Sequence, residues 1–202
     1  KFSFVIVDHY GIGENWESIV LGYFKNLMVI DDLADRNHIC HLLVDQSIGH
    51  NNNSYASLVP NYCSLLVGPR FALLADSFSM FSEKQEKKYS ILINFGGVDK
   101  DNYTMHVLDI FEQSSFSADT TFKIVIGKDY PFKPELIAKL KSSKFQVKLV
   151  ENATNMALEI SDCQFAVGAG GVSLLERSTL GVPSILYAIA DNQKHICLEY
   201  QR

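Results

Sequence analysis

Residues 163–176 read CQFAVGAGGVSLLE, an apolar run followed by glycines and a segment with the spacing of a helix start. This order predicts a buried strand, a glycine turn and a helix. Glycines allow positive φ and let a ligand approach the main chain, while the first turn of a helix offers unpaired N–H groups and partial positive charge. The stretch therefore indicates an α/β fold with a phosphate-binding turn at the end of one strand.

Two side chains beyond the turn fit this interpretation. Ser173 can cap the helix or touch a phosphate, and Glu176 stands one helical turn further along, where a carboxylate can accept hydrogen bonds from ribose hydroxyls. A plainer interpretation stays open. Glycine turns also let a helix pack closely, and the helix dipole alone favours a glutamate near the start of a helix.

A second glycine turn follows the apolar run SILINF at residues 90–95. Gly96 and Gly97 come directly after this run, and a helical pattern begins near Asn102. In open α/β sheets, ligands bind at the edge where the strands have their carboxyl ends. Two such turns in the same half of the chain favour a nucleotide site.

Apolar runs of strand length alternate with helical patterns along the chain. Several runs are continuously apolar, which is typical of a parallel sheet covered on both faces. The sequence therefore predicts an α/β protein with right-handed crossovers. The expected strands are residues 2–8, 27–31, 39–45, 63–67, 89–95, 121–126, 146–150, 164–167 and 184–187. The expected helices are residues 14–25, 102–112, 134–141, 155–161, 172–180 and 193 onward, with Trp16 on the buried face of the first.

The chain has 202 residues, of which 47% are hydrophobic and 20% charged, so it is long enough for one large domain or two small ones. Its formal net charge of -5 argues against nonspecific binding of nucleic acid, which depends on a basic surface. No apolar run is long enough to span a membrane. These features do not define the oligomeric state.

The four cysteines lie too far apart for a paired metal-binding motif, and three stand in or beside apolar runs. This usage indicates reduced thiols and a cytoplasmic location. His38, Cys40 and His41 stand near several aspartates, but the alternation of a strand would point the two histidines in different directions. We therefore expect no metal site.

The polar stretch SMFSEKQEKK at residues 79–88 replaces apolar periodicity with charge just before the strongest strand. It predicts a boundary near residue 82, which gives a first domain of residues 1–82 and a second of residues 83–202. The chain has no initiator Met, starts in a strand-like run and ends in a helix-like one. We expect a fragment that holds the C-terminal part of the first domain and a second domain cut short at its end.

A set of short motifs occurs in a fixed order along nearly the whole chain. The motifs are Asp8-His9-Tyr10-Gly11, Asp31-Asp32-Leu33-Ala34-Asp35-Arg36, His38-x-Cys40, Leu42-Leu43-Val44-Asp45-Gln46, Gly68-Pro69-Arg70-Phe71-Ala72-Leu73-Leu74, Phe95-Gly96-Gly97-x-Asp99, Gly168-Ala169-Gly170-Gly171 and Asp191-Asn192-Gln193. This ordered set resembles the UDP-sugar hydrolases of pseudaminic acid biosynthesis, which release UDP from UDP-2,4-diacetamido-2,4,6-trideoxy-β-L-altropyranose. The resemblance implies the GT-B-like fold of the MurG-type glycosyltransferases, with two Rossmann-like domains of parallel sheets, the first incomplete here.

The resemblance also implies roles for single residues. Tyr10 and Asn192 match residues of the active site, and His9, beside Tyr10, is a candidate substitute base. A histidine at the end of a strand is more often a hydrogen-bonded structural residue. The partner would be a UDP-sugar, with no cofactor or metal. The implied substrate-binding residues are Gly96, Gly97, Gly170 and Gly171 with Ser173 at the diphosphate, Glu176 at the ribose, and main-chain groups around Asn155 and Met156 at the uracil.

Hydrolysis at an anomeric carbon needs a positioned water, a base and stabilisation of the departing diphosphate. The resemblance implies that a histidine in an N-terminal Gly-x-Gly-His loop places the water. That loop would precede Lys1, so we expect this fragment to be inactive. Two other functions stay open: a MurG-like UDP-sugar glycosyltransferase, and a non-catalytic UDP-sugar-binding module.

Overall fold

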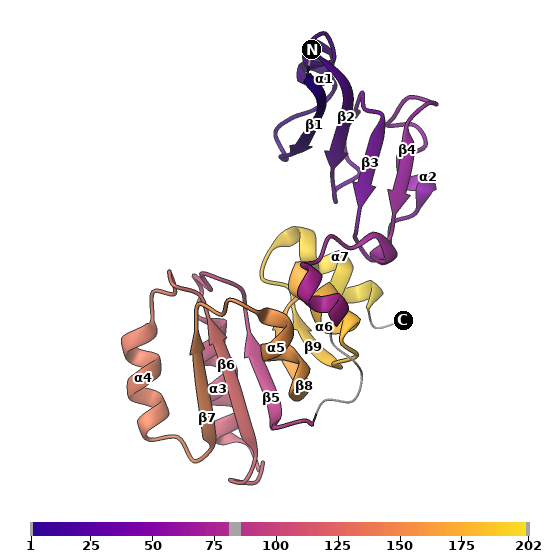
Figure 1. The fold of residues 1–202 in the computed structure, drawn as a ribbon. Helices are drawn as coiled ribbons and strands as arrows, with labels where there is room; N and C mark the ends of the chain where they lie inside the picture. The colour runs from indigo at the N-terminus through magenta and orange to yellow at the C-terminus, as the bar shows by residue number, and fades with distance from the viewer. Residues whose placement is uncertain (1, 81–85, 201–202) are drawn as a thin grey trace. The chain divides into compact units, whose positions relative to one another are not determined.

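The computed structural model describes residues 2–80 and 86–200. The chain divides into two compact units (Figure 1). The first comprises Lys1–Leu73 together with Leu198–Arg202, and the second comprises Leu74–Cys197. The boundary expected near residue 82 falls outside the described residues, so the division into residues 1–82 and 83–202 stays a prediction.

The first unit is built on four parallel strands in the order β1-β2-β3-β4. Apolar side chains of this sheet, among them Leu27 and Leu43, form a buried cluster with Tyr55 of helix α2. The elements are β1 (Phe2–Asp8), α1 (Glu14–Val20), β2 (Phe24–Ile30), β3 (Leu42–Asp45), α2 (Asn52–Tyr55), β4 (Ser64–Val67) and a single turn of 3-10 helix (Pro69–Phe71).

The second unit holds five parallel strands in the order β7-β6-β5-β8-β9. From β5 the chain steps outward to β6 and β7, and then crosses back to β8 on the other side of β5. Ligands of doubly wound sheets bind where the strand order reverses in this way. The elements are a 3-10 helix (Asp76–Met80), β5 (Tyr89–Asn94), α3 (Tyr103–Gln113), β6 (Thr121–Ile126), α4 (Lys133–Lys141), β7 (Gln146–Glu151), α5 (Met156–Ser161), β8 (Cys163–Ala169), α6 (Val172–Thr179), β9 (Ser184–Tyr187) and α7 (Asp191–Glu199).

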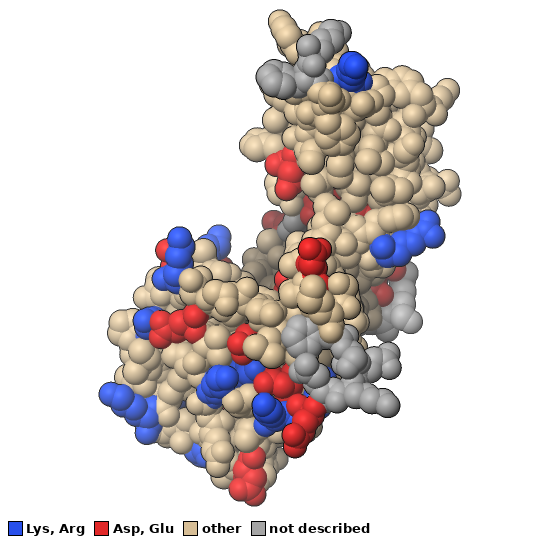
Figure 2. All heavy atoms as spheres, in the orientation of Figure 1, with Lys and Arg blue, Asp and Glu red and all other residues tan. Residues whose placement is uncertain are grey.

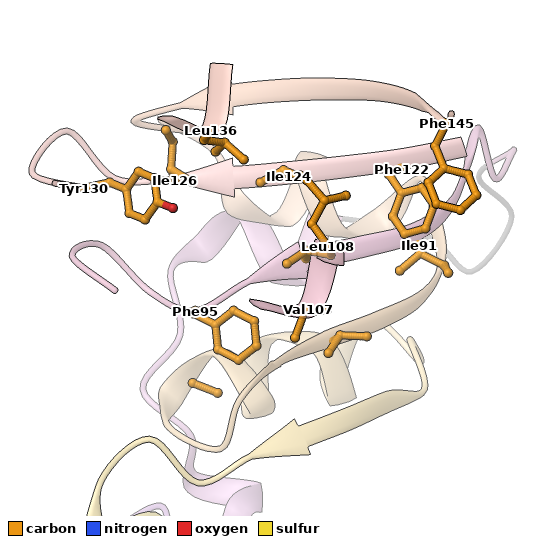
Figure 3. Packing of buried hydrophobic residues seen from close by; sticks show 13 residues of the cluster. Ile91, Phe95, Val107, Leu108, Phe122, Ile124, Ile126, Tyr130, Leu136 and Phe145 are labelled. Atoms are coloured by element: carbon orange, nitrogen blue, oxygen red, sulfur yellow. The ribbon is translucent and has the colours of Figure 1, made fainter. Parts of the chain in front are cut away.

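The second sheet carries a buried cluster on each face. Ile91 and Ile93 of β5 belong to one cluster, and Leu92 between them belongs to the other, as the alternation of a strand requires. Figure 3 shows the first cluster, in which the rings of Phe122 and Phe145 lie 4.7 Å apart. The continuously apolar strands of the sequence thus reflect a sheet covered on both sides.

A buried lysine interrupts the apolar strand β6. Lys123 is 1% exposed, and its Nζ lies 2.9 Å from Glu159 Oε2 and 2.5 Å from Asp162 Oδ1. A buried ammonium requires such partners because desolvation of an unpaired charge is costly. This ion-pair cluster connects β6 to the end of α5.

Helix α1 is shorter than the pattern of residues 14–25 predicts, since it ends at Val20 and β2 begins at Phe24. The buried side of this helix carries Glu17, whose Oε2 accepts a hydrogen bond from the backbone N–H of Ile39 at 2.6 Å. The expected burial of Trp16 is wrong, because its side chain is 42% exposed.

On the face drawn in Figure 2, Lys and Arg are interspersed with Asp and Glu over the second unit. Mixed signs at short spacing produce a weak overall field, because neighbouring opposite charges largely cancel at a distance. Within the described residues, the helices are all too short or too polar to cross a membrane.

Candidate functional site

A cavity of about 250 Å³ lies at the carboxyl edge of the second sheet, where the strand order reverses. Its wall comes from the ends of β5, β6 and β7 and from the starts of α5 and α6. The lining residues are Asn94, Gly96, Gly97, Val125, Ile126, Gly127, Asn152, Ala153, Met156, Ser173 and Glu176. The structure therefore brings together five of the predicted substrate-binding residues, namely Gly96, Gly97, Met156, Ser173 and Glu176.

The turn after β5 gives the cavity an open stretch of main chain. Gly96 has φ +86°, in the left-handed region that favours glycine. A Cβ on Gly96 or Gly97 would have no atom within 4 Å, so both face open space. Asp99 anchors this turn to α3, because its carboxylate accepts hydrogen bonds from the N–H groups of Tyr103 and Thr104, each at 2.8 Å.

Helix α6 forms the opposite wall. Its N-cap residue is Gly171, which has no side chain to accept from the N–H groups of the first turn. Burial raises the pKa of Glu176, and the positive charge of Arg177 partly offsets this effect. The wall thus combines helix N–H donors, which suit an anion, with a carboxylate that suits a hydroxyl donor.

Gly170 and Gly171 do not line the cavity. The N–H of Gly170 donates to the carbonyl of Tyr187 at 3.2 Å, and a Cβ on Gly170 would lie 2.8 Å from Cys197 Sγ of α7. A Cβ on Gly171 would lie 3.4 Å from Gln193 Nε2. Both glycines therefore allow α7 to pack closely, and their contact with a diphosphate stays a prediction.

The side chain of Arg177 in α6 contacts the end of β8, where the glycine turn begins. It is 1% exposed, its Nη2 donates to the carbonyl of Ala169 at 2.7 Å, and its Nε donates to Ser184 Oγ at 3.0 Å. A Cβ on Gly168 would lie 2.9 Å from Arg177 Nη1 and 2.3 Å from the carbonyl oxygen of Asn94. Only glycine fits at residue 168 without a shift of its surroundings.

The wall at α5 contains the predicted Met156, whereas Asn155 caps the helix, since its Oδ1 accepts from the N–H of Leu158 at 3.2 Å. Sequence reasoning missed Asn152 and Ala153, which follow β7, and Gly127, which follows β6. Ligands of open α/β sheets bind at the carboxyl ends of the strands. Inspection of the residues after every predicted strand, and not only of the two glycine-rich turns, finds these three residues.

The carboxyl edge of the first sheet carries Tyr10. Its side chain is 59% exposed, and its hydroxyl donates to Asp32 Oδ2 at 3.2 Å. Desolvation raises the pKa of Tyr10, and the Asp32 charge and hydrogen bond raise it further. Desolvation also raises the pKa of Asp32, with contributions from the charges of Asp31 and Asp45, although the Tyr10 hydrogen bond opposes them. The neutral hydroxyl of Tyr10 is thus a hydrogen-bond donor beside the Asp32 carboxylate. Further hydrogen-bond donors would stabilise the ionised form of Asp32.

Two further carboxylates of this edge, those of Asp31 after β2 and Asp45 at the end of β3, are buried and belong to one network. The hydroxyl of Tyr55 is 2.9 Å from both Asp31 Oδ2 and Asp45 Oδ2, and Arg36 Nη2 lies 2.7 Å from Asp31 Oδ1. Asp31 also accepts from the N–H groups of Leu33 and Ala34, so the residues after β2 form an Asp-stabilised turn. The network fixes the turn that presents Asp32.

The remaining predicted catalytic residues are His9 and Asn192. His9 Nδ1 accepts from the N–H of Gly11 at 2.9 Å, so this nitrogen is engaged in the local turn and the structural role considered for His9 has a specific contact. Asn192 lies on α7, but its side chain is outside the described part of the chain. Its catalytic role stays a prediction.

The described residues contain no group of three or more His, Cys, Asp or Glu placed to hold a metal ion. A larger hollow of about 620 Å³ lies on the face of the second sheet, lined mainly by apolar side chains such as Ile110, Phe165 and Ile185. Ser90 and Thr120 place it toward the amino ends of β5 and β6. Its lining is mostly apolar and it lies on a face of the sheet, whereas the smaller cavity lies at the carboxyl edge where ligands of such sheets bind, so the smaller cavity is the candidate nucleotide site.

No family model matches the chain. An uncharacterized protein of Methanocaldococcus jannaschii is 28% identical over 92% of this chain and 40% of its own length. The UDP-2,4-diacetamido-2,4,6-trideoxy-beta-L-altropyranose hydrolase of Campylobacter jejuni is 31% identical over 53% and 39%, and the spore coat polysaccharide biosynthesis protein SpsG of Bacillus subtilis is 28% identical over 62% and 38%. The chain thus spans about two fifths of the length of each of these relatives.

Among solved structures, the pneumococcal O-GlcNAc transferase GtfA in complex with UDP and GlcNAc aligns with a TM-score of 0.53 at 17% identity. The alignment covers 94% of this chain and 43% of GtfA. This likeness bears on the fold alone. The chain has the α/β, GT-B-like fold expected from the sequence, with one parallel sheet in each unit.

Proposed function

We propose that the edge cavity of the second unit binds the UDP part of a UDP-sugar, and that the protein is a UDP-sugar hydrolase of nonulosonic acid biosynthesis. The observation that carries the proposal is the convergence of Gly96, Gly97, Ser173 and Glu176 on one cavity. The sequence similarity to the Campylobacter jejuni hydrolase supports the substrate class.

The chemistry of the lining matches the parts of UDP. The open main chain at Gly96 and Gly97 and the uncapped start of α6 supply N–H donors for the phosphates. Glu176 accepts hydrogen bonds from the ribose, and its half-buried position strengthens them. The volume of about 250 Å³ is slightly below the roughly 300–1,000 Å³ of whole ligand sites, so the nucleotide occupies it and the sugar extends beyond.

Hydrolysis then requires groups at the sugar. UDP is a good leaving group, so N–H donors that stabilise the departing diphosphate lower the barrier without a strong acid. Tyr10, whose hydroxyl donates to Asp32, is the proposed active-site residue of the first unit. With Nδ1 engaged by Gly11, His9 has only Nε2 free of this turn, so His9 is the weaker candidate for activating water.

The second candidate function is UDP-sugar glycosyl transfer, favoured by the likeness of the fold to the transferase GtfA. The two functions differ in the group that receives the sugar. Incubation of a chain extended to the length of the relatives with UDP-2,4-diacetamido-2,4,6-trideoxyaltropyranose, with and without a saccharide acceptor, separates them. Free sugar formed without acceptor supports hydrolysis, whereas UDP release that depends on acceptor supports transfer.

The test of the binding site is calorimetric titration of the chain with UDP, with ADP and UMP as controls. We expect UDP to bind more tightly than either. Gly97→Ala places a methyl group into open space at a position without positive φ, so we expect weaker UDP binding with an unchanged melting temperature. Equal affinity of the wild-type chain for UDP and ADP, or an unaffected Gly97→Ala chain, would contradict the proposal.

A further inference from the structure

Two cysteines of the first unit lie in contact although they are distant in sequence. Cys40 precedes β3 and Cys63 precedes β4, and these strands pair with each other. Their Sγ atoms are 3.5 Å apart. Cys40 is fully buried, whereas Cys63 is partly exposed. The pair therefore combines one thiol that solvent reaches with one that only its neighbour reaches.

The cysteines of the second unit have different surroundings. Cys163 is buried in the second cluster of that unit, and its thiol donates to the carbonyl of Glu159 at 3.3 Å. Cys197 lies on α7 beside Gly170. Burial raises the pKa of both thiols, to about 12 for Cys163. Neither is favoured as a nucleophile at neutral pH, since the thiolate is the reactive form.

The electrostatics of the contacting pair are asymmetric. The hydrogen bond between the two thiols lowers the pKa of Cys63, burial opposes this effect, and a hydrogen bond from the backbone of Leu43 adds to it. The same contact and burial raise the pKa of Cys40. Cys63 is thus the sulfur that is both accessible and nearer to its ionised form, which suits the first attack. Cys40 has a raised pKa like Cys163, but its Sγ lies 3.5 Å from Cys63 Sγ, so proximity places it to attack a disulfide formed at Cys63.

We propose that Cys40 and Cys63 form a dithiol site that reacts with low-molecular-weight disulfides such as oxidised glutathione. The Cys63 thiolate attacks one glutathione sulfur, a Cys63–glutathione disulfide forms, and one glutathione leaves as thiolate. The Cys40 sulfur then attacks Cys63 Sγ, loses its proton, and displaces the second glutathione. The protein dithiol is oxidised to a disulfide and one glutathione disulfide is reduced to two thiols, so electrons and atoms balance.

The product would connect the start of β4 to the segment before β3. That segment contains His38, whose Nδ1 lies 2.7 Å from Glu17 Oε1 and whose Nε2 lies 3.9 Å from Asp31 Oδ1. In a reducing compartment the dithiol form prevails, and an oxidising shift favours the disulfide. The site therefore offers a reversible modification of the unit that carries Tyr10.

The test uses the reduced chain in a glutathione buffer, acid quenching, and mapping of all four cysteines by mass spectrometry. We expect a Cys40–Cys63 disulfide to form before Cys163 or Cys197 carries glutathione, and roughly tenfold faster in the folded chain than in urea. Equal rates in buffer and urea, or modification of Cys197 ahead of Cys63, would overturn the proposal.

Three variants assign the roles of the two sulfurs. Cys40→Ala should accumulate the Cys63–glutathione adduct, Cys63→Ser should leave Cys40 unmodified, and Cys197→Ser, the matched control, should form the disulfide at the wild-type rate. An adduct on Cys40 in the Cys63→Ser chain with none on Cys63 in the Cys40→Ala chain would refute the assignment. If the buried Cys40→Ala replacement fails to fold, the wild-type mapping still decides the proposal.

Discussion

The two parallel sheets end in opposite kinds of carboxyl edge. In the second unit the edge is an open cavity whose turn is glycine and whose helix start has no side-chain cap. In the first unit the edge is occupied by side chains, because Tyr55 and Arg36 contact the carboxylates of Asp31 and Asp45. The same architecture offers N–H donors at both edges, and the sequence decides whether the protein's own carboxylates or a ligand will meet them.

The largest expected effect is a loss of stability that is confined to the second unit. Phe122 is fully buried between Phe111 and Phe145, so Phe122→Ala should destabilise the second unit by about 3–5 kcal/mol. Trp16, the one tryptophan of the chain, lies in the first unit. In urea unfolding of the Phe122→Ala chain, the transition followed by far-UV circular dichroism should therefore move to lower urea concentration, whereas the transition followed by Trp16 fluorescence should keep its midpoint. Phe116→Ala, at a half-exposed ring, is the control, with an expected loss of about 1 kcal/mol. A parallel shift of both signals would show that the units unfold together.

The second prediction concerns the occupied edge. Tyr55→Phe removes the hydroxyl shared by Asp31 and Asp45 and leaves buried carboxylate oxygens with fewer donors. We expect a loss of about 1.5–3 kcal/mol in the first unit, followed by Trp16 fluorescence in urea. UDP affinity at the second unit should not change. The matched variant Tyr62→Phe, at an exposed ring, should stay within about 0.5 kcal/mol of wild type, and an equal loss there would argue against the network.

The third prediction concerns the open edge. Glu176→Ala should weaken UDP binding by about 1–3 kcal/mol, whereas Glu135→Ala on exposed α4 should not. In the proposed role, only the ionised form of Glu176 can accept hydrogen bonds from both ribose hydroxyls, and burial raises the pKa of Glu176. As the pH falls, protonation begins above the range of an ordinary glutamate, so the affinity gap between wild type and variant should close there. A gap that is constant across acidic pH would exclude this role.

The smallest expected effect lies at the exposed side chain of Tyr10 and its partner Asp32. Burial is the first cause of the raised pKa of Tyr10, and the charge of Asp32 is the second. Asp32→Asn should therefore lower the pKa of Tyr10 only part of the way to its ordinary value. The tyrosinate absorbance that Tyr10→Phe removes identifies the signal in a pH titration. An unchanged titration would mean that Asp32 does not act on the phenol.

The sequence predicted the architecture well because a doubly covered parallel sheet leaves a local signature. Continuous apolar runs predicted β1, β6 and β9 with the bounds of the structure, and the two glycine turns predicted four of the eleven residues that line the cavity. The errors at α1, in its length and in the burial of Trp16, arise because a contact distant in sequence decides which side of the helix is buried. Glu17 is buried by a partner beyond the helix, the N–H of Ile39, and no pattern within residues 14–25 reveals that contact.

The buried charges of the second unit are hidden for the same reason. Lys123 and Arg177 resemble surface residues in the sequence, yet their partners come from other elements, α5 for the lysine and the end of β8 for the arginine. The role of Asn152 in the cavity likewise depends on the position of β7 in the sheet. Local pattern therefore predicts elements, whereas the partners of buried polar groups emerge only when the elements are assembled.

The pairing of β5 with β8 has a consequence for the order of folding. Tyr89 pairs with Cys163, far along the chain, whereas β5, β6 and β7 pair with near neighbours. Long-range pairings of this kind form slowly, because a long loop must close before any contact is gained. The cavity is lined by residues that follow each of these two strands, Gly96 after β5 and Glu176 after β8, so it is complete only once β5 and β8 have paired. A newly made chain is therefore expected to form the edge cavity in the last stage of folding, after most of the sheet already exists.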